Sequence, residues 1–293
     1  MDLLIRRGMC VADRERAIEK LRRVNYYRLS GYWYPFRMCK PDGDGRSDRF
    51  LPGSAFDDVV ALYDFDARLR VAVLAALAPV ELSMRALVGH ALGEIDPCIH
   101  LNADLLGPVA RGERSSEYKE WLNRYNEKLD TSREEFVQHH KGRYGGTLPI
   151  WVAVEVLSFG TLSRCVEASA GSGVLDDIAA SLNISRSILP GQIRSFVYLR
   201  NRIAHNARIW NHSVLDAPAL PGGNKARKRI ERNYGKFDSR SVYCVLVALD
   251  WLFKRASIDD DWLRTEIIPR LESDRFLKRG ICSPRKYGNM DLS

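Results

Sequence analysis

The sequence lacks the paired cysteines that mark zinc and redox sites. Its six cysteines are scattered, and no two of them stand at the C-x-x-C spacing. Such unpaired cysteines are typical of a reducing compartment. A membrane span is not expected either, because the longest uncharged apolar run, residues 71–80, has only ten residues. The first residues lack the apolar core and cleavage site of a signal peptide, so the chain is predicted to be cytoplasmic.

Lysine is scarce among the basic residues. Of the 45 basic residues 34 are arginine, and the net charge is +8. The planar, multi-donor head of arginine suits phosphate better than the point charge of lysine does. With 45% hydrophobic and 28% charged residues, the chain is predicted to be a folded, soluble protein whose charge favours a nucleic-acid partner.

Alternating, strand-like runs are few, and no repeat of 20–50 residues is found. The apolar period near 3.6 predicts an all-α fold. One stretch, 56–92, is long, and Pro79 should kink or split it. The turn-rich cluster 40–48 predicts a loop. Other helices are expected at 13–29, 115–129, 148–168, 175–182, 192–211 and 242–254. We divide the chain into a basic and aromatic N-terminal segment (1–53), a helical core (54–215) and a basic, helical C-terminal extension (216–293).

The most informative stretch is LRNRIAHN, residues 199–206. It sets Arg200 five positions before His205, with Asn201 and Asn206 beside them. The spacing alone is weak, because R-x(4–6)-H arises by chance roughly two times in such a composition, and four instances are present. The surrounding pattern is stronger. One expected helical face is apolar and another polar: Phe196, Leu199, Ile203, Ala207 and Trp210 against Asn201, His205, Arg208 and His212.

These residue types can cut RNA without a metal or cofactor. Histidine can take a proton from a ribose 2′-hydroxyl and return it to a leaving 5′-oxygen. Arginine can stabilise the charged phosphate, and asparagine can orient either group. On an ideal helix Arg200 and His205 stand about 140° apart. They can therefore meet one phosphate only along the rim of a cleft, or if a second copy completes the site.

Three blocks of sequence resemble known families. LRNRIAHN within residues 192–211 is similar to the signature of the HEPN superfamily of helical ribonucleases. LRRVNYYRLSGYWYPFR (21–37) resembles the N-terminal signature of the AbiD/AbiF-like abortive-infection proteins, and PIWVAVEVLSFG (149–160) resembles a third block of that family. The three blocks stand in the right order and cover roughly residues 15 to 215.

The resemblance implies a HEPN-like helical bundle, a bacterial anti-phage role and RNA as target. It also implies a homodimer, because two HEPN units usually face each other, and some relatives are thought to hold a noncoding RNA. Arg200 and His205 carry over as catalytic candidates, with Asn201 beside the arginine. Asn206 follows the histidine, and its role stays open.

Two further features invite a functional interpretation. Arg85 and His90 repeat the R-x4-H spacing and form a possible second site, although Glu81 and Arg85 also suit an ordinary i, i+4 pair. Glu155 stands on an otherwise apolar helix, where an unpaired carboxylate is costly. It is expected to support the site by pairing with Arg200 or Arg202, or to form a purely structural ion pair.

Basic and aromatic residues supply candidate RNA contacts, because aromatic faces stack on unpaired bases while arginines follow phosphates. These candidates are Arg22, Arg23, Tyr27 and Arg28 in the N-terminal block, Arg202, Asn206 and Arg208 around the motif, and Lys225, Arg227, Lys228 and Arg229 in the extension. The aromatic residues of the first group could instead form a small core, and the last group could be a solvated face.

The sequence thus favours a metal-independent endoribonuclease of an abortive-infection system. The main alternative is a non-catalytic RNA-binding protein that forms a ribonucleoprotein with a structured noncoding RNA. A third possibility is a protein-interaction module within a defence assembly.

Overall fold

The computed structural model describes residues 1–41, 45–113, 115–272 and 274–284. In this part of the chain 67% helix and a single two-stranded hairpin confirm the all-α prediction. The helices are α1 (Asp2–Arg6), α2 (Arg14–Val24), α3 (Tyr26–Trp33), α4 (Phe56–Gly93), α5 (Ala103–Leu106), α6 (Pro108–Arg111), α7 (Ser115–Thr131), α8 (Glu135–Arg143), α9 (Ile150–Val156), α10 (Phe159–Ala168), α11 (Val174–Ser181), α12 (Leu189–Ala204), α13 (Asn224–Tyr234), α14 (Val242–Arg255), α15 (Ile268–Glu272) and α16 (Arg275–Cys282).

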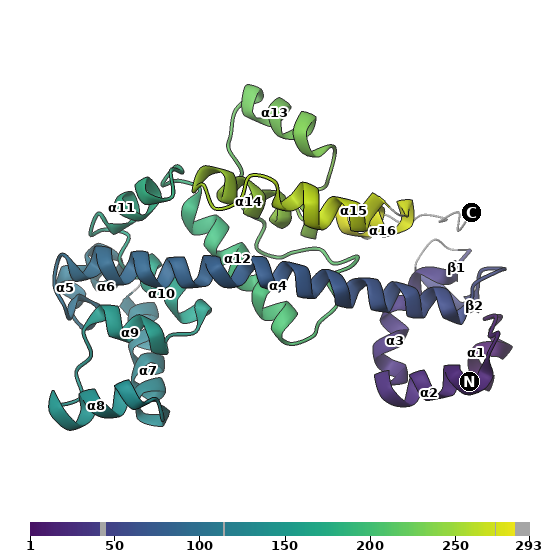
Figure 1. Ribbon diagram of the computed structural model, residues 1–293, viewed down its shortest axis with the longest axis horizontal. Helices are drawn as coiled ribbons and strands as arrows, with labels where there is room; N and C mark the ends of the chain where they lie inside the picture. Colours follow the sequence, from purple (N-terminus) through teal and green to yellow (C-terminus); the bar gives the residue numbers. More distant parts are fainter. Residues whose placement is uncertain (42–44, 114, 273, 285–293) are drawn as a thin grey trace.

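Helix α4 is the axis of the molecule (Figure 1). Its 38 residues extend over about 57 Å at 1.5 Å per residue. The N-terminal helices and the hairpin lie at one end of it, and α5–α8 at the other. Helices α3, α9, α10, α11 and α12 all pack against it. The length and composition of α4 would also suffice to cross a membrane, but a central core helix passes the same test.

Of the expected kink or split at Pro79, the split is wrong, since α4 is one continuous helix through this residue. Proline removes one backbone donor and leaves the carbonyl of Ala75 without its helical partner. Both Ala75 and Pro79 are exposed, so water can solvate that carbonyl.

Two predicted helices are each divided in two. Residues 13–29 form α2 and α3, because Asn25 adopts φ 76°, and its side chain caps α3 by accepting from Tyr27 N. Residues 148–168 form α9 and α10, because Leu157 is extended and Ser158 caps α10 by accepting from Thr161 N. Pro149 precedes α9 as its N-cap residue.

The predicted loop at 40–48 belongs partly to the hairpin. Strand β1 (Arg37–Cys39) pairs antiparallel with β2 (Arg46–Phe50), and Arg37 stands opposite Phe50. Residues 42–44 of the predicted loop lie outside the described residues.

The C-terminal helices close over the core. Helix α14 packs against α12 and α16, and Phe276 of α16 contacts Phe36 and Trp210. Buried residues from all three predicted segments enter one hydrophobic core. Helix α13 has no buried residue and lies at the outside of the molecule (Figure 1), where Ile230 and Tyr234 near its C-terminal end pack against the core.

Candidate functional site

The motif lies at the C-terminal end of α12, and the prediction that this helix continues to Asn211 is wrong. His205 is the C-cap residue, and Asn206 has φ 53°. Asn206 N donates to Ile203 O at 2.8 Å and Ala207 N to Arg202 O at 2.9 Å. This is the Schellman arrangement, in which an asparagine can take the left-handed position that ends a helix. Asn206 therefore terminates α12 and leaves His205 exposed.

The expected polar stripe consequently does not continue beyond the end of α12. Arg208 lies in the following loop and donates to Gly31 O of α3. His212 folds back on α12, where its Nε2 lies 2.6 Å from the hydroxyl of Tyr198. The apolar stripe nevertheless ends in the core, because Trp210 is fully buried although it is outside the helix.

A buried carboxylate holds the loop after the motif in place. Asp66 of α4 is fully buried and accepts from the backbone N–H of Ile209 at 3.2 Å and of Trp210 at 2.7 Å. It also accepts from Tyr32 Oη at 2.7 Å and pairs with Arg70. Burial raises the pKa of Asp66, while the hydrogen bonds that it accepts and the charge of Arg70 oppose that rise. Helices α3 and α4 and the loop thus share one anchor.

Arg200 is held by a carboxylate of α4. Its Nε lies 3.0 Å from Glu81 Oε2, and its Nη1 donates to Asn201 Oδ1 at 3.2 Å. Arg85 Nη2 donates to the other oxygen of Glu81 at 2.7 Å and also binds Val154 O. Glu81 is buried and is shared between two guanidinium groups, which fixes Arg200 in one direction.

The expected role of Glu155 is wrong. This residue is exposed, and in the described part of the chain it forms no ion pair. Its side of α9 faces solvent together with Trp151, which is 50% exposed. Glu81 takes the position beside Arg200 that was predicted for Glu155.

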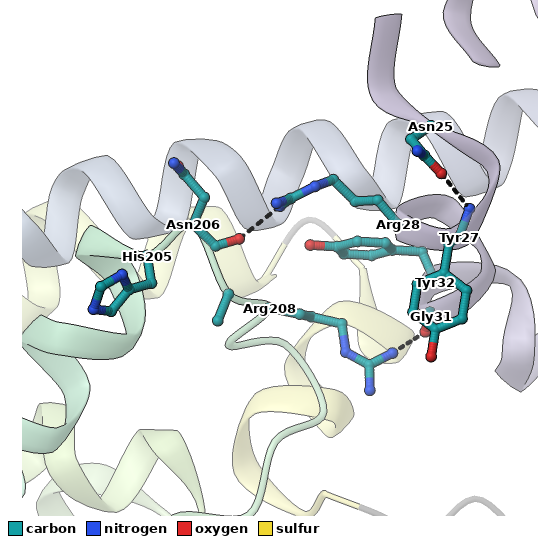
Figure 2. Close-up of a pocket in the computed structure, with 9 residues that line it drawn as sticks. Asn25, Tyr27, Arg28, Gly31, Tyr32, His205, Asn206 and Arg208 are labelled. Atoms are coloured by element: carbon teal, nitrogen blue, oxygen red, sulfur yellow. Dashed lines mark hydrogen bonds between the residues drawn. The ribbon is translucent and has the colours of Figure 1, made fainter. Parts of the chain in front are cut away.

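An open pocket joins the end of α12 to α3 (Figure 2). It has a volume of about 500 Å³. Figure 2 shows Arg28 reaching from α3 toward Asn206, while Arg208 reaches back toward Gly31. The Nη1 of Arg28 donates to Asn206 O at 2.7 Å across 178 positions of sequence. The lining residues are Asn25, Tyr27, Arg28, Gly31, Tyr32, His205, Asn206, Ala207 and Arg208.

Five of the predicted site residues therefore meet in one place: Tyr27, Arg28, His205, Asn206 and Arg208. Arg200 and Asn201 do not line this pocket. Arg202 does not line the pocket, but its Nε donates to the backbone oxygen of Arg208, a lining residue, at 2.7 Å. Burial lowers the pKa of Arg202, and neighbouring Tyr198 opposes the effect.

The other predicted residues lie apart from the pocket lining. Arg22 and Arg23 are exposed on α2, where Arg23 pairs with Glu19. His90 is exposed, and its Nε2 lies 3.3 Å from Oε1 of Glu94. The possible second site of Arg85 and His90 stays a prediction. The cations of the extension lie exposed on α13: Lys225, Arg227, Lys228 and Arg229.

Asp66 and Asn25 were not predicted as part of the site. The signal for Asp66 was its position four residues before Arg70, a spacing typical of an ion pair on one helix face. Asn25 interrupts a helical pattern, and asparagine is among the residue types other than glycine that most readily take positive φ. Among the described residues no cluster of three or more His, Cys, Asp or Glu side chains could hold a metal ion.

The fold and the pocket define an all-α protein that gathers arginine, histidine and asparagine around an open, basic site. Residues 19–211 match the family model of the Abi-like proteins. The match covers 193 of 293 residues, so the chain belongs to the Abi-like protein family. This membership indicates a role in abortive infection. No curated protein and no solved structure matches the chain.

Proposed function

We propose that the protein is a metal-independent endoribonuclease of an abortive-infection system that acts in the cytoplasm, that it is of the AbiD/AbiF-like type, and that a HEPN-type motif forms its active site. The observation that carries the proposal is the pocket, where exposed His205 stands with Arg28 and Arg208. A histidine can transfer protons, and two fixed arginines beside it can bind the charged phosphate, so the three side chains suit cleavage of a phosphodiester bond.

The reaction would be an internal transfer. His205 accepts the proton of a 2′-hydroxyl, the 2′-oxygen forms a bond to phosphorus, and the bond from phosphorus to the 5′-oxygen breaks. The proton passes to that 5′-oxygen, which leaves a 2′,3′-cyclic phosphate and a 5′-hydroxyl. Arg200, oriented by Asn201 and Glu81, stabilises the charge on the phosphate.

The active form would be a homodimer. Arg200 turns to Glu81 and does not line the pocket that His205 borders. A second copy that faces the first could bring the arginine of one chain to the histidine of the other. Sedimentation at increasing protein concentration measures dimer formation. RNA cutting assayed at the same concentrations should show that the activity per chain rises with the fraction of dimer. Full activity of a strictly monomeric sample would refute the dimer.

The enzyme is tested by cutting RNA in EDTA. Wild type should cut, whereas His205→Ala should lose roughly 100-fold or more of the rate, the range of general acid–base catalysis. His139→Ala is the matched control, because His139 is exposed on α8 and follows Arg133 at a similar spacing. It should cut normally. If the wild-type protein binds RNA but never cuts it, either in vitro or in infected cells, the proposed endoribonuclease activity is refuted.

A non-catalytic RNA-binding protein is the second candidate. It is favoured by α13, a helix with exposed lysine and arginine side chains, none of whose residues line the pocket. Two separate cationic surfaces suit a large, structured noncoding RNA. In that case binding should weaken steeply with salt, and His205→Ala should change nothing.

A further inference from the structure

We infer that the pocket between α3 and the loop after α12 holds one unpaired nucleotide of the RNA. In this arrangement Tyr27 stacks on the base, and Arg28 and Arg208 bind the adjoining phosphate. The inference rests on the proposed function, because that proposal supplies RNA as the ligand. It adds the substrate class, which is single-stranded RNA.

Tyr27 offers an unused aromatic face. Its side chain is 85% exposed, whereas the nearby Tyr32 and Trp33 are buried in the core. Asn25 fixes the turn before it by accepting from Tyr27 N at 2.8 Å. The backbone under the ring is therefore ordered while the ring itself is free. Stacking on a base is the interaction for which such a ring is suited.

The two arginines are fixed from opposite walls. Each uses one Nη to bind a backbone carbonyl of the other wall, Arg28 that of Asn206 and Arg208 that of Gly31. The guanidinium of Arg208 also lies over the ring of Tyr32, 5.8 Å from its centroid. An arginine carries five N–H donors, so each keeps donors for a phosphate while its direction is already set. Such preorganisation lowers the entropic cost of binding.

The shape of the site favours an unpaired nucleotide over a duplex. A volume of about 500 Å³ lies within the range of pockets that enclose a small ligand. A paired base stays within its stack and cannot reach the face of Tyr27, whereas an unpaired base can turn outward. His205 borders the same pocket.

Binding of a fluorescent six-nucleotide RNA tests the inference, measured by anisotropy in the His205→Ala background so that no cutting interferes. Tyr27→Ala should weaken binding roughly five- to hundredfold, the range for loss of one base–aromatic stack. Tyr27→Phe should bind normally. Tyr144→Ala is the matched control, because Tyr144 is 62% exposed beyond α8. It should also bind normally.

A blunt-ended duplex of two complementary RNA strands and adenosine 5′-monophosphate are the comparison ligands. The inference requires that Tyr27→Ala leave duplex binding unchanged and that the mononucleotide bind more weakly than the oligonucleotide. Equal binding by Tyr27→Ala and the parent protein overturns it, even if the enzyme cuts RNA. A mononucleotide that binds as tightly as the oligonucleotide also overturns it. Conversely, if binding depends on Tyr27 but the wild-type protein never cuts RNA, the proposed nucleotide pocket is supported and only the proposed ribonuclease activity is refuted.

Discussion

Replacing Glu81 with glutamine should destabilise the protein strongly. The carboxylate is 11% exposed and pairs with Arg85, which is 12% exposed, and with Arg200, which is 31% exposed. Glutamine keeps the shape but removes the charge, so two guanidinium groups are left side by side with no anion between them. Loss of one partner of a buried pair costs about 3–5 kcal/mol. Since Arg200 is partly solvated, we expect about 3 kcal/mol.

Urea denaturation measures this free energy, and the double variant identifies its origin. Removing one of the two cations as well, in Glu81→Gln/Arg85→Gln, should recover part of the loss because the remaining arginine can turn toward water. Glu19→Gln is the control, because Glu19 and Arg23 form an exposed i, i+4 pair worth about 0.5 kcal/mol or less. A Glu81→Gln variant no less stable than Glu19→Gln would refute the role of Glu81 as the shared anchor of Arg200.

Two further predictions concern the core. Burial lowers the pKa of His100 to about 4. Between pH 6.5 and 4 only the unfolded chain binds this proton, so stability should fall by about 3 kcal/mol as pH falls through that window, and denaturation of His100→Gln should show a flatter decline. Gly280→Ala should cost about 1–3 kcal/mol, because its Cβ would overlap the indole of Trp210. Gly142→Ala on exposed α8, where nothing lies within 4 Å, should instead stabilise; equal effects would contradict the packing.

Helices whose apolar period is strong were predictable from the sequence. The expected 56–92 corresponds to α4, and 242–254 corresponds to α14. The errors lie where a polar residue ends one helix while the apolar period continues. At Asn206 the chain leaves α12, yet Trp210 returns to the same core that a longer helix would have reached. Periodicity records which residues are buried and does not record the backbone path between them.

The composition of the site was predictable, but its assembly was not. Arg28 and Arg208 were candidates from residue type and local pattern, and His205 was a candidate from these and from the family resemblance. Their meeting depends on Asp66, which binds the backbone of the loop and the hydroxyl of Tyr32. Such a contact joins segments more than 140 positions apart, so no local pattern contains it.

The extent of the family match separates the two cationic surfaces. The match begins at residue 19, before α3, and ends at residue 211, just after the loop that Asp66 anchors. Both walls of the pocket therefore lie inside it, whereas α13 lies outside. A function common to Abi-like proteins has to be carried by structure that they share. The pocket meets that condition, whereas the basic face of α13 lies outside the matched residues.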